Sequence, residues 1–284
     1  MPAIHRLPHV RAAIYNQPWM IQEEWLRAIC DIFERASAGD KVVWQGEPGE
    51  SKVAYQVVDG VAIVDLMGPI FPRANLMTRV SGATSSEEFR NNFSRAMDDG
   101  DVESVLLRID SPGGAVSGIF EAASLVYAGR FKKDIVAMCE GTMASAAYLV
   151  GSQASAVYAT EASVVGSIGV VMQIEDDTRQ RMNEGVQTYT LKTGPLKAVG
   201  AGPVTDEQIQ HMRGLMDDFF GRFKSAVTRG RIGIDIDAVS TGAVWIGKKA
   251  EDMGLIDGIM TMDSAMKMLG SGKSLRGAHG SINR

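Results

Sequence analysis

Hydrophobic residues in the middle of the chain gather in short, nearly continuous runs. Strands that are covered on both faces show this pattern, because neither side of their sheet meets water. Between the runs, hydrophobic positions recur at helical spacing over Thr84–Met97 and from about Val116 to Ala128. Alternating strands and helices predict an α/β layer architecture with a largely parallel sheet. The expected strands are Val61–Leu66, Val105–Ile109, Ile135–Met138, Ala156–Ala159, Ile168–Met172 and Thr188–Leu191.

The two ends of the chain differ from this central part. From Pro18 to Ala38, hydrophobic residues recur at helical spacing, which predicts a helix; they are Trp19, Ile21, Trp25, Leu26, Ile29, Ile32 and Phe33. The polar segment Gln45–Lys52, which contains glycine and proline, predicts a linker. We therefore expect a helical N-terminal extension over residues 1–52, a main domain over residues 53–269 and a flexible tail over residues 270–284.

A long helix is expected near the end of the main domain, from Thr205 to about Arg229. Thr205 and Gln208 have the spacing of a capping box, and the acidic residues between them suit the positive end of the helix dipole. The hydrophobic residues of this helix predict one broad buried face, made of Ile209, Met212, Leu215, Met216, Phe219, Phe220 and Phe223.

Composition and charge narrow the class of protein. Of the 284 residues, 45% are hydrophobic and 22% are charged, as in ordinary soluble domains. The net charge of −5 disfavours a nucleic-acid-binding protein, which would normally carry a basic patch. No hydrophobic window approaches the ~20 residues that cross a bilayer, and the N-terminus lacks the hydrophobic region of a secretory signal. Cys30 and Cys139 lack metal-type spacing, so we expect reduced thiols in a cytoplasmic protein.

Residues that can carry chemistry follow the expected strands. Asp110–Gly114 reads Asp-Ser-Pro-Gly-Gly, and Gly166–Val170 reads Gly-Ser-Ile-Gly-Val. Ser145 opens an expected helix among alanines and is the candidate nucleophile. Glycines at a strand end let backbone N–H groups approach a ligand oxygen, so Gly114 and Ala146 are the candidate donors of an oxyanion hole. Each motif alone is more often a tight turn or a small packing residue.

A serine nucleophile needs a base that removes its proton. The four histidines of the chain do not follow strands, so a Ser-His-Asp triad is not expected unless the fold brings His211 to the site. A lysine can replace histidine when burial lowers its pKa well below the ~10.4 of a free side chain. Lys197, 52 residues after Ser145, stands among apolar residues and is the candidate base, with Lys192 as the alternative. Ser167 is the candidate for a hydroxyl that orients the amine.

Together these motifs resemble the signal peptide peptidase A family, the protease IV-like serine peptidases. The resemblance runs from about Val61 to Ile259 and includes Gly254–Asp257, which is similar to the usual end of the family's domain. It implies a fold of stacked ββα units of the crotonase and Clp-protease type. It also implies assembly into homo-oligomeric rings or domes.

The resemblance further implies a Ser-Lys dyad that hydrolyses peptide bonds through an acyl-enzyme, without metal or cofactor. Ser145 matches the nucleophile and Lys197 the general base. Ser167 matches the residue that orients the base, and Gly114 matches the oxyanion-hole glycine. The partner implied is a polypeptide substrate.

Two departures from the membrane-associated members change the expected substrate. Those enzymes commonly follow the nucleophile with two glycines, where this chain has Ala146 and Ala147, and they carry a membrane anchor that is not found here. With the Pro8–Gly39 extension, these features are more similar to phage head-maturation proteases, which are soluble and act on scaffold or portal proteins inside a prohead. We therefore expect a capsid-maturation peptidase, located in the host cytoplasm or the prohead.

Three alternatives stay open. One is a bacterial peptidase that degrades signal peptides. Another is acyl-CoA chemistry of the crotonase type, which would need an acidic catalytic residue and would not explain Ser145 together with Lys197. The third is a catalytically silent capsid or ring subunit, and the presence of Ser145, Ser167 and Lys197 counts against it.

Overall fold

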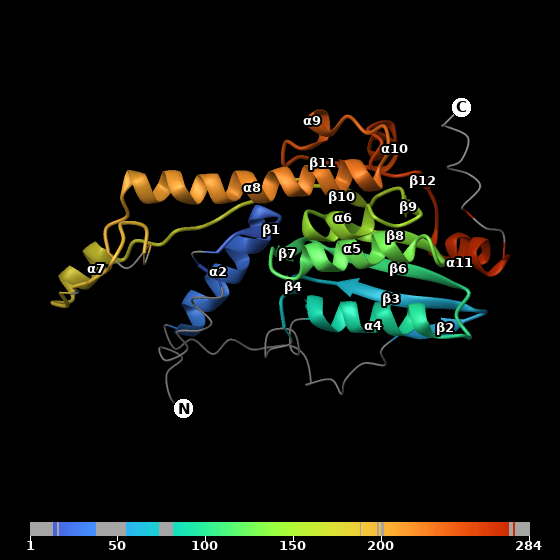
Figure 1. Cartoon of the computed structure of the whole chain (residues 1–284), viewed down its shortest axis with the longest axis horizontal. Coiled ribbons are helices and arrows are strands. Elements are labelled where there is room, and N and C mark those ends of the chain that lie inside the picture. The colour runs from blue at the N-terminus through green and yellow to red at the C-terminus, as the bar shows by residue number, and fades with distance from the viewer. Residues whose placement is uncertain are drawn as a thin grey trace.

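A computed structural model describes residues 14–15, 17–37, 55–73, 82–187, 189–197, 199, 202–272 and 275 (Figure 1). The predicted linker at Gln45–Lys52 lies outside the described residues, as does most of the predicted tail. The boundaries of the extension and of the main domain therefore stay predictions.

The strands and helices alternate along most of the described chain. The strands are β1 (Trp19–Ile21), β2 (Gln56–Val58), β3 (Val61–Met67), β4 (Ile70–Phe71), β5 (Thr84–Ser85), β6 (Ser104–Ser111), β7 (Gly113–Ala115), β8 (Asp134–Ala144), β9 (Ala156–Ala159), β10 (Val164–Gly166), β11 (Val244–Ile246) and β12 (Gly258–Ile259). The helices are α2 (Glu23–Ser37), α4 (Ser86–Asp98), α5 (Ile119–Gly129), α6 (Ala146–Gly151), α7 (Thr178–Asn183), α8 (Asp206–Gly230), α9 (Ile236–Val239), α10 (Gly247–Asp252) and α11 (Met262–Gly270).

The main sheet has the strand order β11-β10-β8-β6-β3-β2, and β9 lies between β8 and β12. Strands β3, β6, β8 and β10 run parallel to one another, whereas the outer strands β2 and β11 pair with β3 and β10 in the antiparallel sense. The predicted α/β class with a largely parallel sheet is confirmed. Since parallel strands end at the same edge, the segments that follow β6, β8 and β10 come together there.

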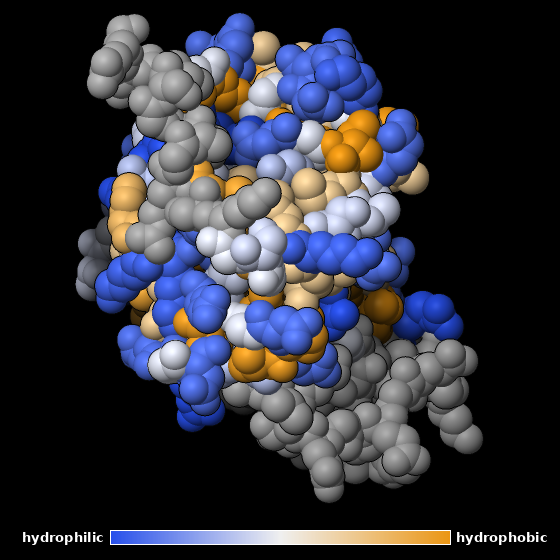
Figure 2. All heavy atoms as spheres, turned by 90° about the vertical axis from the view of Figure 1, so that its right-hand side faces the viewer, coloured by the Kyte–Doolittle hydropathy of each residue, from blue (hydrophilic) through white to orange (hydrophobic). Residues whose placement is uncertain are grey.

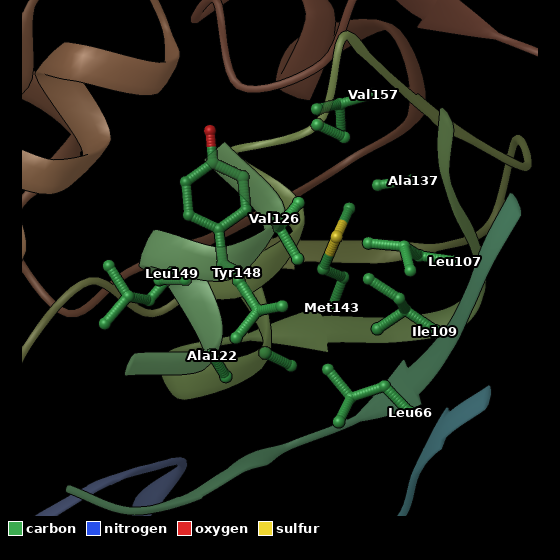
Figure 3. Packing of buried hydrophobic residues seen from close by; sticks show 14 of the residues in the cluster. Leu66, Leu107, Ile109, Ala122, Val126, Ala137, Met143, Tyr148, Leu149 and Val157 are labelled. Atoms are coloured by element: carbon green, nitrogen blue, oxygen red, sulfur yellow. The ribbon is translucent and has the colours of Figure 1, made fainter. Parts of the chain in front are cut away.

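Alternate residues of the central strands face two different layers of helices. In β3, Ala62 and Val64 belong to the core on the side of α4, α5 and α6, whereas Val61 belongs to the cluster covered by α11. Figure 3 shows the first of these layers, where Leu107, Ile109 and Met143 meet Tyr148 of α6. Burial on both faces explains why the sequence shows continuous hydrophobic runs rather than alternation.

A second, smaller sheet has the order β1-β7-β4-β5. Its strand β1 lies inside the segment for which the sequence predicted a helix from Pro18. That prediction is wrong for Trp19–Ile21, because these residues pair with β7, and correct for most of α2, which begins at Glu23. Leu26 and Ile29 of α2 are buried on the cluster that also contains Trp19 and Phe71, so β1 and α2 are held against the domain together.

Helix α8 has the predicted capping box at Thr205 and Gln208. The predicted broad buried face is correct for Phe223, with Phe219 and Phe220 partly buried against the core, but wrong for Ile209 and Leu215, which are exposed. Figure 1 gives the reason: the N-terminal part of α8 extends beyond the body of the domain, and only its C-terminal part packs against it. The segment from residue 174 to residue 205, which includes α7, lies at this projecting end, and we call its described residues the arm.

Two of the expected short strands differ in the structure. Residues 168–172 do not form a continuous strand: the sheet strand is β10, which ends at Gly166, and beyond it Val171 forms an isolated bridge with Trp19. Residues 189–191 are not in a strand, and Thr188 lies outside the described residues. The chain leaves the main sheet after β10, so hydrophobic residues beyond it lack neighbouring strands to pair with.

The C-terminal end of α8 is fixed to the body by an ion pair between Arg231 and Asp257. Arg231 Nη1 lies 2.6 Å from Asp257 Oδ2, and the backbone N–H of Val157 in β9 donates to the same carboxylate at 2.7 Å. Burial disfavours the charged guanidinium, but the hydrogen bond to Asp257 together with the nearby charges of Tyr148, Asp257 and Tyr158 outweighs it, so the pKa of Arg231 is raised.

The face opposite to the arm is largely hydrophilic. Figure 2 shows it with scattered hydrophobic residues between charged and polar ones. Within the described ranges, no helix combines the length and the hydrophobicity needed to cross a bilayer.

Cys139 of β8 is expected to react slowly with thiol reagents in the folded protein. Burial raises the pKa of its thiol from 9.0 to about 11, so its thiolate fraction at pH 8 is about 100-fold lower than that of an exposed cysteine. Since a thiol whose pKa is raised by folding stabilises the protein fully below pH 9, this contribution is lost as the pH rises from 9 through 11. The rate of modification by a disulfide reagent at pH 8, with and without urea, measures the difference. Equal rates in the two states would contradict it.

Candidate active site

Ser145 occupies a sharp turn between β8 and α6. Its backbone has φ 53° and ψ −118°, a conformation that residues other than glycine rarely adopt. The turn is held from both sides, because the N–H of Ser145 donates to Gly166 O at 2.8 Å and its carbonyl accepts from Leu149 N–H at 2.9 Å. A strained residue that the surrounding structure fixes in this way is typical of functional sites.

The hydroxyl of Ser145 is buried, and its Oγ has no hydrogen-bond partner among the described residues. Leaving a buried polar group unpaired costs about 1–3 kcal/mol. The sequence predicted Ser145 in the first turn of a helix, and the structure places it at the N-cap of α6. Ala146, the predicted second oxyanion donor, is the first residue of α6, so its N–H is among those that have no partner inside the helix.

The predicted Gly113–Gly114 motif lies directly beside Ser145. Gly113 has φ +102°, and a Cβ built on it would lie 3.0 Å from Ser145 Cβ. Its N–H donates to Ser111 Oγ, whose hydroxyl in turn donates to Gly68 O at 2.6 Å. Ser111 thereby fixes the turn between β6 and β7, a role that the sequence analysis did not assign.

Gly114→Ala is expected to destabilise the protein strongly. A Cβ on Gly114 would lie 2.1 Å from the backbone oxygen of Ile70 in the neighbouring strand β4, and neither backbone can move without breaking the small sheet. We expect a loss of about 2–4 kcal/mol in the free energy of unfolding, measured in urea. The matched control is Gly100→Ala, where a Cβ meets open space and the change should stay within about 0.5 kcal/mol. An unfolding midpoint equal to that of the control would contradict the clash.

Ser167 is placed beside Ser145 by the parallel register of two strands. Ala144 of β8 pairs with Gly166 of β10, so the next residues of both strands, Ser145 and Ser167, follow side by side at about the 4.8 Å spacing of neighbouring strands. Ser167 also has a positive φ of 52°, and its N–H donates to Ala243 O at 2.7 Å. The structure thus brings Ser145, Ser167, Gly114 and Ala146 to one edge of the sheet.

Lys197 is the predicted site residue that the fold of the single chain does not place with the others. It lies in the arm, and its backbone N–H donates to Gly194 O at 3.1 Å. Its side chain is exposed, so the apolar burial expected from its sequence neighbours is not present in the single chain. In Figure 1 the arm lies at the projecting end of α8, well away from α6.

The two alternative bases are placed less favourably. Lys192 also lies in the arm, but its Nζ donates to Pro195 O at 3.0 Å. His211 lies on the exposed surface of α8. Within the part of the chain that the structure describes, no three or more His, Cys, Asp or Glu side chains gather in a way that could hold a metal ion.

A third strand reaches this edge of the sheet from the N-terminal extension. Strand β1 pairs with β7, and Trp19 exchanges both backbone hydrogen bonds with Val171. No local sequence signal predicts this contact, because the partners of β1 lie about 90 and 150 residues away. Beyond Ser167, an open pocket of about 300 Å³ is lined by Ile168 to Val170, Met216, Phe220 and neighbouring residues.

Comparison with known proteins identifies the chain as a member of a peptidase family. Residues 128–276 match the model of peptidase family S49. The head-tail preconnector protein GP5 of Enterobacteria phage P21 is 29% identical over 286 residues, covering 93% of this chain and 57% of the relative. The capsid assembly protease C of Escherichia phage lambda is 26% identical over 291 residues, covering 94% and 66%. Protease 4 of Salmonella typhi is 28% identical over 210 residues, covering 72% and 33%. The chain thus spans less than two thirds of the length of each of these relatives.

Two solved structures are similar in fold. One is an enoyl-CoA hydratase/isomerase family member, with a TM-score of 0.44 and 16% identity over 76% of this chain and 73% of that chain. The other is a membrane-bound stomatin-specific protease in complex with a substrate peptide, with a TM-score of 0.44 and 10% identity over 73% of this chain and 78% of that chain.

Proposed function

Because the chain belongs to peptidase family S49, we propose that it is a serine endopeptidase with Ser145 as nucleophile and Lys197 as general base. The observation that carries this proposal is the buried Ser145 Oγ without a partner, held on a strained turn beside Gly113 and Ser167. Both the strain and the unpaired hydroxyl cost stability, which is expected where a side chain serves a reaction.

In the proposed reaction, Ser145 Oγ attacks the carbonyl carbon of the scissile peptide bond while Lys197 Nζ takes the hydroxyl proton. The developing negative charge on the carbonyl oxygen is stabilised by the backbone N–H groups of Gly114 and Ala146. The C–N bond then breaks, and Nζ gives the proton to the leaving amine. Lys197 Nζ then takes a proton from water, and the hydroxide hydrolyses the ester that remains on Ser145.

The position of the arm bears on how Lys197 would reach Ser145. The arm exposes hydrophobic side chains, with Tyr189 78% and Leu191 97% exposed, along with Met182 and Val186. An exposed apolar segment is expected to bind another surface. We therefore place the arm on a neighbouring copy of the chain, where Lys197 meets that copy's Ser145. Burial in this contact favours the neutral amine that a base requires.

The substrate proposed is a protein of an assembling phage capsid, such as scaffold or portal. The two phage relatives match more than nine tenths of this chain, whereas protease 4 of Salmonella typhi matches 72%. The extension that contains β1 and α2 falls within the longer matches, and this favours the capsid role over the degradation of signal peptides.

The test is covalent labelling of the oligomer with a fluorophosphonate, followed by peptide mapping. A fluorophosphonate reacts with an activated serine and leaves ordinary hydroxyls unmodified. We expect a single adduct on Ser145. Hydrolysis of casein and of a synthetic signal peptide by the same preparation compares the two substrate classes. No adduct on Ser145 between pH 6 and 10 would overturn the proposed nucleophile.

A further inference from the structure

Strand β1 lies between two other backbones at the edge of the candidate site. On one side, Trp19 N–H donates to Val171 O at 2.8 Å and Val171 N–H donates to Trp19 O at 2.9 Å. On the other side, β1 runs antiparallel to β7, with Met20 opposite Gly114 and Ile21 opposite Gly113. A three-residue strand with both edges bonded fills a slot that is just wide enough for one extended peptide.

The register places a carbonyl group of β1 against the proposed oxyanion donor. Gln22 N–H donates to Pro112 O at 3.0 Å, and hydrogen-bonded pairs alternate along an antiparallel ladder. Met20 and Gly114 therefore form the next hydrogen-bonded pair, with the Gly114 N–H facing the Met20 carbonyl. A Cβ built on Gly113 would lie 2.1 Å from Met20 O and 3.0 Å from Ser145 Cβ. The Met20 carbonyl oxygen and the Ser145 side chain are therefore both close to Gly113.

The side chain of Met20 points into the main core of the domain and away from α2. Met20 is fully buried in the main core cluster, which contains Met143 and Ala146 on either side of Ser145. Trp19 and Ile21 point the other way, into the cluster made with α2. Met20 thus has the backbone and side-chain position expected for the substrate residue that precedes the bond to be cleaved.

We propose that β1 is a tethered, substrate-like occupant of the peptide-binding cleft, and that the pocket filled by Met20 accepts an unbranched apolar side chain. This inference rests on the proposed function, because it takes Ser145 as the nucleophile. A tethered strand competes at an effective concentration in the millimolar range, so a free peptide binds only to the fraction of molecules in which β1 has left. A reagent therefore reaches Ser145 only in the fraction of molecules in which β1 has left, so that β1 slows labelling of the parent without abolishing it.

The first experiment compares the fluorophosphonate labelling rate of the full chain with that of Met20→Ala. Truncating the buried side chain weakens the hold of β1 on the cleft, so we expect labelling at least about 10-fold faster and a lower KM with little change in kcat. The control is Met138→Ala, an equally buried methionine in the cluster under α11, which should leave the labelling rate unchanged. Equal labelling of the parent and Met20→Ala, with both folded, would overturn the inference.

A second measurement on the unaltered protein keeps the inference testable if Met20→Ala does not fold. The peptide acetyl-Pro-Trp-Met-amide, at millimolar concentration, should replace β1 in the cleft. Hydrogen exchange of the Trp19 amide should then speed up at least about 10-fold, while Val171 stays protected because the peptide takes over its bonds. Unchanged exchange at Trp19 with the peptide bound would contradict the inference.

The two proposals fail in different ways. If no variant labels at Ser145, the proposed nucleophile is wrong, and the exchange experiment alone then decides whether β1 occupies a peptide-binding cleft. If Ser145 labels and casein is hydrolysed, but Met20→Ala and the peptide change nothing, the peptidase proposal stands and β1 is a fixed part of the fold.

Discussion

The Ser145→Ala variant is expected to lose hydrolysis of casein by roughly 10⁴-fold or more, because no other group can form the acyl-enzyme. The same variant is expected to fold at least as stably as the parent. Removing the hydroxyl eliminates a buried polar group without a partner, worth about 1 kcal/mol or more, while alanine keeps the same backbone turn. Hydrolysis rates and urea unfolding of the two proteins measure both effects.

Ser104→Ala provides a matched control for this result. Ser104 begins β6, and its Oγ is also buried and without a partner among the described residues, but it lies at the opposite end of the parallel strands from Ser145. The control should gain similar stability and keep its activity. If Ser145→Ala retains a tenth or more of the parent activity, Ser145 is not the nucleophile.

Mixing two inactive variants is expected to restore activity. Lys197→Ala lacks the base and Ser145→Ala lacks the nucleophile, so each alone should be inactive. When the subunits of the two variants exchange, a site that takes Ser145 from one copy and Lys197 from its neighbour can be complete. With random mixing at equal amounts, about one quarter of the sites regain both groups, and about a quarter of the parent activity should return.

The control is a mixture of Ser145→Ala with Lys192→Ala. If Lys192 is not the base, Lys192→Ala is itself active, and mixing should only dilute it. Size-exclusion chromatography of each mixture shows whether copies associate and exchange. Associated and exchanged copies without any recovery would rule out the arrangement between neighbours, since Lys197 would then serve only its own chain.

Much of the fold was predictable because its signals are local. The central strands, buried on both faces, show as continuous hydrophobic runs, and the cap at Thr205 appears where the sequence places it. Strand β1 was missed because Trp19–Ile21 continue directly into the helical pattern of α2, and only their pairing with the distant strand β7 makes them a strand. The exposure of α8 was missed because periodicity predicts which face is apolar, not whether anything covers it.

The candidate site also contains both residues whose positions could be predicted from the sequence and one whose position could not. Ser145, Gly114 and Ser167 each follow a strand, and parallel strands bring their ends to one edge, so their proximity could be predicted from the order of motifs. Lys197 follows no strand of the main sheet. Its apolar neighbours suggested burial, but they lie in the arm, where the described residues leave Leu196 and Val199 half-buried and Lys197 exposed. Local composition does not distinguish residues buried in the core from residues on a surface that binds a partner.

The anchoring of α8 at one end gives the helix the properties of a rigid spacer. Its 25 residues extend about 37 Å, and the Arg231–Asp257 pair fixes the C-terminal end while the other end carries the arm. In the proposed contact between neighbouring copies, the length of α8 therefore sets how far Lys197 reaches. Adding or deleting one turn would shift the arm by about 5.4 Å and rotate it little, changing which neighbour it meets. In this proposed arrangement, the number of residues in α8 determines both how neighbouring copies are arranged and whether Lys197 reaches Ser145.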